Sequence, residues 1–290
     1  MLRNNAHQVV LASIFLLVAH CSGRPSTSYH HQLDNPSDTA NLIENVEDRM
    51  FVAPSNATGV KVSQWHANMS VNPEELGEYL EGDIMLPNTF KRNGMRLESF
   101  RWPGGVVPYM ISPFFNEDQQ KVIRDAMTDY HLHTCIKFKP YMGEETDYIR
   151  ITAGNTGCWS TIGRIGGPQN LNLQVPECLT RKGTVIHELM HTIGFLHEQS
   201  RFERDDFVDI QWHNIQPGRE VNFAKSERDT TEAFGVIYDY GSVMHYSVGA
   251  FSRNGQPTII PRDKRAGQIG QREGFSARDI QKIQRMYKCA

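Results

Sequence analysis

Apolar side chains recur at helical spacing in three separate stretches of this chain. They predict helices over about 116–133, 183–191 and 276–287. Asn116 and Ser276 stand at the start of the first and third stretches, where residues of these types cap helix N-termini. The long separation between the second and third helices holds few periodic apolar positions, so we expect mostly loops there.

Short β-rich or alternating runs predict strands at four places, 106–111, 136–138, 148–152 and 171–174. The resulting order is a strand, a helix, several strands, a second helix, irregular chain and a last helix. This order favours an α+β domain of two lobes. We expect a cleft between the lobes, with the 183–191 helix as its floor.

The start of the chain has the pattern of a secretory signal peptide over residues 1–23. Arg3 gives a positive start, residues 9–19 are mostly apolar, and small residues follow at 21–23. The apolar run is shorter than the roughly 20 residues that span a bilayer, and no other run approaches that length. The sequence therefore predicts a secreted, extracellular product with no membrane partner.

Residues 24–92 differ in composition from the rest. They lack cysteine and carry ten acidic against five basic side chains, and their polarity predicts an extended, weakly structured region. Sequons for N-glycosylation begin at Asn56 and Asn68, as suits an exposed segment of a glycoprotein. The segment is either a disordered linker or a pro-segment.

The stretch 187–197 carries the strongest chemical signal. His187 and His191 are four apart, so on a helix they share a face with β-carbons roughly 5–6 Å apart and can bind one metal ion. Glu188 is placed as a general base, and Gly194 can end the helix so that His197 returns as a third ligand. Three protein ligands leave a position for water, which predicts a catalytic zinc site. The alternative is a set of core histidines beside an ordinary C-cap glycine.

The string from His187 to Glu198 resembles the signature of the astacin family, a member of the metzincin clan. The resemblance continues through the basic and acidic cluster at 201–205 and a Met-turn at 242–246, and covers about 93–290. It implies a metzincin or zincin-like catalytic domain with an active-site helix and a Met-turn. It also implies that Tyr246 binds the resting zinc and later donates a hydrogen bond to the oxyanion, with Met244 as an apolar floor.

The resemblance extends to a mechanism of latency. The sequence from Leu80 to Asp83 is similar to the inhibitory Phe-x-Gly-Asp motif of astacins, with leucine in place of phenylalanine. It implies an inhibitory pro-segment, 24–92, whose Asp83 takes the place of water on zinc. The basic pair at 91–92 is a site for an activating protease, and the new ammonium at Asn93 would approach Glu198.

Four cysteines follow the signal peptide. An even number in a secreted chain predicts disulfides, and four cysteines allow three pairings. The family resemblance implies the pairs Cys135–Cys289 and Cys158–Cys178.

Together these features predict a secreted zinc endopeptidase made as a latent precursor. We expect one Zn²⁺ per catalytic domain, Glu188 as general base for zinc-bound water, protein or peptide substrates and a monomer, with no nucleic-acid partner. The rival hypothesis is a catalytically inactive binding protein on the same fold. Four basic residues either line the primed side of the cleft or are simply solvated: Arg253, Lys264, Arg265 and Arg272.

Overall fold

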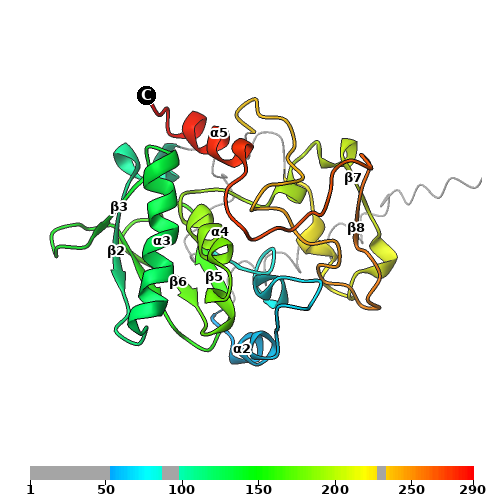
Figure 1. Ribbon diagram of the computed structural model, residues 1–290, viewed down its shortest axis with the longest axis horizontal. Coiled ribbons are helices and arrows are strands. Elements are labelled where there is room, and N and C mark those ends of the chain that lie inside the picture. The colour runs from blue at the N-terminus through cyan, green and yellow to red at the C-terminus, as the bar shows by residue number, and fades with distance from the viewer. Residues whose placement is uncertain (1–52, 87–97, 227–232) are drawn as a thin grey trace, which may run out of the picture.

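The computed structural model describes residues 53–86, 98–226 and 233–290. Its helices are α2 (Asn56–Ser63), α3 (Glu117–His133), α4 (Lys182–Thr192) and α5 (Ala277–Met286). Its strands are β1 (Ile84–Met85), β2 (Val106–Ile111), β3 (Lys137–Pro140), β4 (Tyr148–Thr152), β5 (Cys158–Thr161), β6 (Pro168–Leu173), β7 (Val208–Ile210) and β8 (Ile259–Pro261). Figure 1 shows the larger sheet and α3 on one side of the molecule and β7 and β8 on the other.

The larger sheet has the strand order β1-β5-β6-β4-β2-β3. Strands β6, β4, β2 and β3 run parallel to one another, whereas β5 is antiparallel to β6. The last edge is occupied by β1, which comes from the N-terminal segment and pairs with β5 in the parallel direction. This edge therefore joins the N-terminal segment to the body of the protein.

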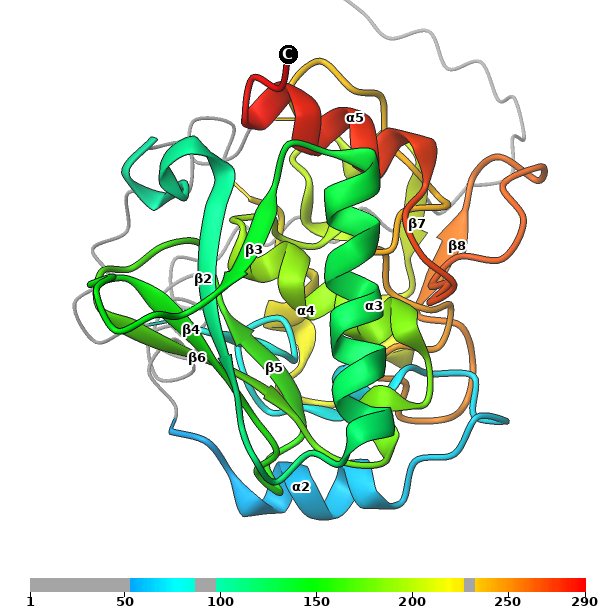
Figure 2. The ribbon, with the colours of Figure 1, turned by 60° about the vertical axis from the view of Figure 1, so that its left-hand side comes forward.

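Helices α3 and α4 pack against each other and against one face of this sheet (Figure 2). Asn116 caps α3 by accepting a hydrogen bond from the Gln119 N–H, and the buried side chains of α3 recur three or four residues apart. Tyr130 of α3 donates a 2.7 Å hydrogen bond to the Ile186 carbonyl of α4. This contact fixes α4 between α3 and strands β5 and β6.

A second, smaller apolar cluster lies around β7 and β8. It includes Val208, Phe223, Tyr246 and Ile259, all less than 3 % exposed. The first cluster belongs to the sheet and the helices α3, α4 and α5. Two cores with mixed helix and sheet confirm the predicted α+β fold of two lobes.

The helix predictions hold closely. Helices α3 and α5 start after the predicted caps, and α4 extends the prediction by one residue at each end. All four predicted strands are present: 106–111 and 148–152 match β2 and β4, and the other two have shifted ends. The short strands β5, β7 and β8 were not predicted. All four residues of β5 are buried, so this strand lacks the alternation that reveals a half-exposed strand.

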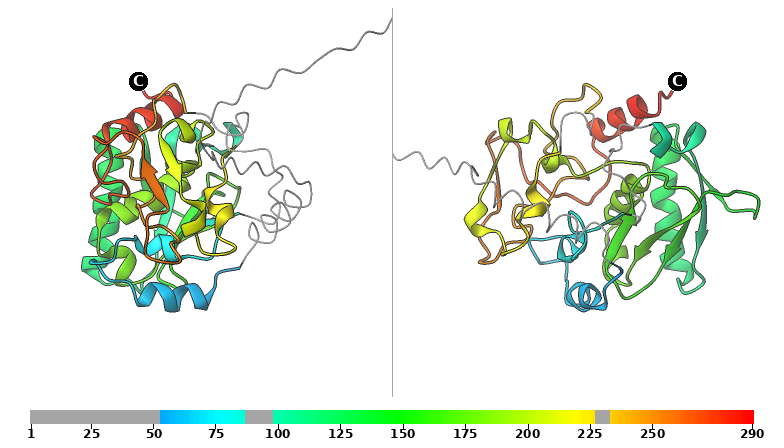
Figure 3. Two further views of the ribbon diagram at one scale, coloured as in Figure 1. Left: turned by 90° about the vertical axis from the view of Figure 1, so that its right-hand side faces the viewer. Right: turned by 180° about the vertical axis from the view of Figure 1, so that it is seen from behind.

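The expectation of a weakly structured region is wrong for residues 53–86. This segment contains α2, a 3₁₀ turn at Pro73–Leu76 and β1, and it buries Val62 and Tyr79 completely. Figure 3 shows it between the sheet and the lobe that carries β7 and β8. The predicted signal peptide, the basic pair at 91–92 and Asn93 lie outside the described residues.

Two disulfides are present, Cys135–Cys289 and Cys158–Cys178, with Cα separations of 5.4 and 5.7 Å. The first joins the chain end beyond α5 to the start of β3, and the second joins β5 to the turn before α4. This is the pairing that the family resemblance implies. Within the described ranges, no helix is both long and apolar enough to cross a bilayer.

Candidate metal centre and active site

Helix α4 presents two histidines on adjacent turns and then ends abruptly. Gly194 has φ 107°, a left-handed conformation that favours glycine. Its N–H donates to the His191 carbonyl, and the Phe195 N–H donates to the Met190 carbonyl, which together form a Schellman motif. The reversal brings His197 back to face His187 and His191.

The three histidines converge on one buried carboxylate. Asp83 Oδ2 lies 3.0 Å from His187 Nε2 and 3.3 Å from His197 Nε2, and Asp83 Oδ1 lies 3.4 Å from His191 Nε2. All four side chains are no more than 1 % exposed. One donor atom from each lies within 4.8 Å of the donor atoms of the others. The chain has thus brought together residues more than 100 positions apart.

The other ring nitrogen of each histidine is bound to an oxygen acceptor. Nδ1 of His187 lies 2.8 Å from the Val243 carbonyl, and Nδ1 of His191 lies 2.6 Å from the Phe195 carbonyl. Nδ1 of His197 lies 2.7 Å from the Glu81 carboxylate. Since these acceptors require a proton on Nδ1, a neutral imidazole must present the lone pair of its Nε2 to the centre of the site.

This donor set fits a divalent cation. The Nε2 atoms of His187 and His191 are 3.1 Å apart, and lone pairs at that distance repel one another unless a positive charge lies between them. Asp83 Oδ1 has no hydrogen-bond partner among the described residues, although it is buried. Three imidazoles and one carboxylate form a ligand set that zinc prefers.

Glu188 lies on α4 directly after the first histidine. Its side chain is fully buried, and neither carboxylate oxygen has a hydrogen-bond partner in the described part of the chain. Burial raises the pKa of Glu188 well above its usual value, and the negative charges of Asp83 and Glu74 add to this effect. A buried carboxylate without a partner is suited to accept and hold a proton.

The Met-turn residues lie behind the histidines. Met244 is buried in the larger core, and its carbonyl accepts a 3.0 Å hydrogen bond from the Glu198 N–H. Tyr246 packs its ring 4.6 Å from the ring of His197, and its hydroxyl donates a 2.5 Å hydrogen bond to the Glu81 carbonyl. His245 lies between these two Met-turn residues, and its Nε2 is hydrogen-bonded to the Tyr238 hydroxyl at 2.7 Å.

Sequence reasoning missed three acidic residues of the N-terminal segment. Glu81 binds His197 as described above. Glu75 accepts hydrogen bonds from the Ser247 N–H, at 2.6 Å, and from the Ser247 hydroxyl. Glu74 forms a buried ion pair with Arg272. The only available signal was the position of Glu81 inside the Leu80–Asp83 motif.

The four basic residues with two candidate roles differ in how far the structure exposes them to solvent. Arg272 is 1 % exposed and paired with Glu74, so simple solvation is wrong for this residue. It lies beside the Met-turn, where one guanidinium nitrogen donates to the His245 carbonyl at 3.1 Å. The other three, Arg253, Lys264 and Arg265, are exposed.

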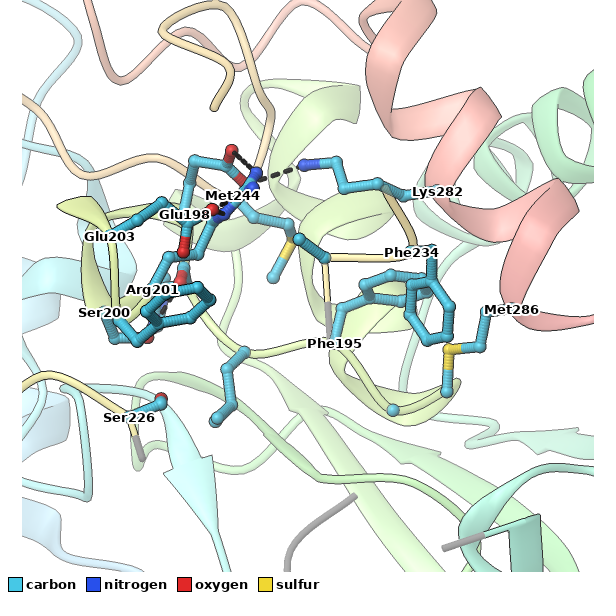
Figure 4. Close-up of a pocket in the computed structure, with 15 residues that line it drawn as sticks. Phe195, Glu198, Ser200, Arg201, Glu203, Ser226, Phe234, Met244, Lys282 and Met286 are labelled. Carbon is cyan, nitrogen blue, oxygen red and sulfur yellow. Dashed lines mark hydrogen bonds and ion pairs between the residues drawn. The ribbon is translucent and has the colours of Figure 1, made fainter. Parts of the chain in front are cut away.

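A pocket is lined in part by His197 and by Met244 of the Met-turn (Figure 4). Apolar side chains, among them Phe195, Phe234 and Met286, line one part of it. Glu198 lines another, and its carboxylate accepts hydrogen bonds from Lys282 at 2.6 Å and Arg201 at 2.7 Å. Although burial opposes ionisation, these cations hold the pKa of Glu198 below its usual value.

Known proteins are similar to this chain. Residues 94–288 match the family model "Astacin (Peptidase family M12A)". Zinc metalloproteinase nas-14 of Caenorhabditis elegans is 47 % identical over 65 % of this chain and 37 % of its own length. Zinc metalloproteinase nas-4 of the same organism is 37 % identical over 87 % of this chain and 86 % of its own length.

The solved structure of high choriolytic enzyme 1, a hatching enzyme zinc-protease from the medaka fish Oryzias latipes, is also similar. It superposes with a TM-score of 0.62 and 38 % identity, covering 67 % of this chain and 96 % of that one. This chain spans about a third to a half of the length of the first curated relatives that it matches. Because the family model matches most of its length, the chain belongs to the astacin family.

Proposed function

We propose that this chain is a secreted zinc endopeptidase that is synthesised as a latent precursor. One observation carries the proposal. Three buried histidines present their Nε2 atoms to one point, while each Nδ1 is tied to an oxygen acceptor. Relatives that are named zinc metalloproteinases support the same metal and the same class of reaction.

His187, His191 and His197 would hold the zinc ion, with Asp83 as a fourth ligand in the precursor. Zinc, when bound, polarises a peptide carbonyl and lowers the pKa of water to about 7. Glu188 takes the proton of the attacking water on its carboxylate and passes it to the leaving amine nitrogen. Its burial and its two unpaired oxygens support this role.

Tyr246 supplies the hydrogen bond to the developing oxyanion. In the precursor its hydroxyl already donates to a peptide carbonyl, that of Glu81. A substrate carbonyl that replaces the Glu81 carbonyl would receive the same donor, and its gain in charge during attack strengthens the bond. Tyr246 as an additional ligand of the resting ion remains a proposal from the family resemblance.

An extended peptide is the substrate class that the cleft favours. Strand β5 is the edge of the body of the sheet, and β1 of the N-terminal segment pairs with it over Ile84 and Met85. When β1 leaves, the backbone groups of β5 become available to a substrate strand. Backbone pairing is independent of side-chain identity, so it suits an endopeptidase.

Latency follows from the occupied cleft. Asp83 fills the place beside the histidines where water must bind, and Glu81 holds both His197 and Tyr246. Removal of residues 24–92 by an activating protease, after the basic pair at 91–92, would vacate these positions. The new ammonium at Asn93 would then approach Glu198, whose carboxylate lines a pocket.

Secretion is supported by two disulfides and by the exposure of both sequon asparagines, Asn56 and Asn68. Disulfides of this kind persist in oxidising, extracellular compartments. These features agree with the signal peptide that the sequence predicts.

The decisive experiment measures proteolysis and bound zinc together. After removal of the pro-segment, we expect cleavage of a generic protein substrate and one zinc per chain by elemental analysis. Glu188→Ala should abolish cleavage and retain the zinc. Undiminished cleavage by this variant would contradict the role of Glu188, and a fully inactive wild-type chain with zinc bound would favour a binding protein.

A further inference from the structure

The N-terminal segment contacts the catalytic domain at a second place, away from the histidines. Helix α2 lies against residues 155–157, next to the start of β5. The side-chain amide of Gln174 connects the two parts, because its Nε2 donates to the Gly59 carbonyl at 2.9 Å and its Oε1 accepts from the Gly157 N–H at 2.9 Å. Gln174 of the catalytic domain thus binds the backbone of the pro-segment helix α2 through a hydrogen bond.

Close packing accompanies these hydrogen bonds. A β-carbon added at Gly59 would lie 1.9 Å from the backbone oxygen of Asn155, so only glycine allows this approach. On the same side of α2, Val62 is completely buried and belongs to the larger apolar core. Thr58 is also completely buried, facing Gly157.

Tyr79 makes a further connection. Its hydroxyl accepts a hydrogen bond from the Ser55 N–H at 2.9 Å and donates one to the Thr156 carbonyl at 2.7 Å. Its ring packs edge-on against Trp159 at 6.1 Å between centroids. We call the group that meets α2 and Tyr79 the α2 docking surface: Asn155, Thr156, Gly157, Trp159 and Gln174.

None of these contacts involves a metal ligand, Glu188 or Tyr246. The expected cut, near 91–92, also lies outside the segment 53–86 that makes them. Hydrolysis there would break no contact described above. It would only remove the covalent tether, and with it the high effective concentration of the segment.

We propose that the α2 docking surface is a binding site for the pro-segment that is separate from the catalytic cleft, so that the cleaved pro-segment stays bound and continues to inhibit. The inference rests on the proposed function, because it concerns the regulation of the same site. Cleavage and dissociation are then two steps of activation, and the α2 docking surface governs the second. After dissociation the surface is open on the mature enzyme.

The test uses the full chain with residues 88–92 replaced by the site of a sequence-specific protease. After complete cutting at micromolar concentration, we expect both fragments to elute together in size-exclusion chromatography. We expect activity to appear only on dilution. Gly59→Ala and Tyr79→Phe should each raise the concentration at which the fragments separate by roughly tenfold or more, because a close contact or two hydrogen bonds are lost.

The matched control is Val60→Ala, in the same helix, since Val60 is 59 % exposed and faces away from the contact. Gly59→Ala is informative because alanine favours the helix itself, so weaker binding reports the docking contact. Immediate separation of the wild-type fragments, or equal affinity for Gly59→Ala, Tyr79→Phe and Val60→Ala, would overturn the proposal.

The elution experiment repeated in a Glu188→Ala background does not depend on catalysis. With Glu188 intact, fragments that separate only on dilution but yield no activity would count against the proposed function and leave the docking inference standing. Fragments that separate at once and are active would count against the docking inference alone.

Discussion

Glu74 and Arg272 form an ion pair in which neither side chain is exposed to solvent. The two residues belong to different parts of the chain, the N-terminal segment and the part that matches the family model. Two further hydrogen bonds from Arg272 go to the carbonyls of His245 and Gln271. Loss of the N-terminal segment, as proposed for activation, would therefore leave a buried guanidinium without its carboxylate.

We predict that Glu74→Gln lowers the free energy of unfolding of the precursor by about 3–5 kcal/mol, because it leaves Arg272 buried without a counter-charge. Denaturant unfolding of the full chain measures this change. The control is Asp125→Asn, which breaks the exposed i,i+4 pair with Lys121 and should cost no more than about 0.5 kcal/mol. Equal effects of the two substitutions would contradict the importance of the buried pair.

Tyr246→Phe should reduce kcat of the activated enzyme by about 10²–10³-fold, since it removes a hydrogen-bond donor aimed at the oxyanion. We expect KM and the zinc content to change little. Tyr240→Phe removes a hydroxyl of the same type, bound to the Phe207 carbonyl, and serves as the control. A loss that appears in KM or in zinc content would assign Tyr246 a different role.

The two disulfides should differ in their contribution to stability. Cys135 and Cys289 are separated by 154 positions, and Cys158 and Cys178 by 20. In the chain-entropy model, removing the first pair as a double serine variant costs about 5 kcal/mol and removing the second about 3 kcal/mol. Chemical denaturation of each double variant under oxidising conditions measures the order, and a reversed order would show that native-state contacts outweigh loop closure.

Both N-glycosylation sequons lie in the N-terminal segment, and their asparagines, Asn56 and Asn68, are exposed. The sequence after residue 92 contains no further sequon. We therefore predict that a secreted precursor carries glycans which glycosidase treatment removes, and that the mature domain has the mass of its bare polypeptide. Mass spectrometry before and after activation checks this, with Asn56→Gln and Asn68→Gln to assign each site.

Asp147 should make the free energy of unfolding depend on pH in the acidic range. Although partial burial opposes it, hydrogen bonds from the Gly167 N–H, at 2.7 Å, and from Arg164 hold the pKa of Asp147 below its usual value. A carboxylate with a lowered folded-state pKa stabilises the fold above its unfolded pKa of about 3.9, and this contribution is lost as the pH falls further. We expect Asp147→Asn to flatten the decline of the unfolding free energy below about pH 4. A parallel decline in both proteins would contradict this assignment.

The sequence predicted those parts of the fold and site that depend on local spacing. The caps at Asn116 and Ser276 and the four-residue interval between His187 and His191 act within one or two turns of helix. Their consequences are therefore visible in a short window of sequence. The chain reversal at Gly194 could be predicted for the same reason, because it depends on the left-handed conformation of a single residue.

Other parts could not be predicted because they depend on contacts between distant segments. Glu74 meets Arg272, and Glu81 meets His197, across more than 100 positions, and neither acid differs locally from a solvated one. Helix α2 also has no apolar stripe that a periodicity search would find. Its close approach relies on Gly59, so the absence of a side chain is the feature that matters.

The place of β1 at the edge of the sheet has a consequence for solubility. A sheet edge with unpaired N–H and carbonyl groups is a template for association with another chain. Strand β1 covers this edge at β5 and so blocks strand-to-strand association there. Activation as proposed would expose the same edge, and the short length of β5, four residues, would then limit aggregation of the mature protein.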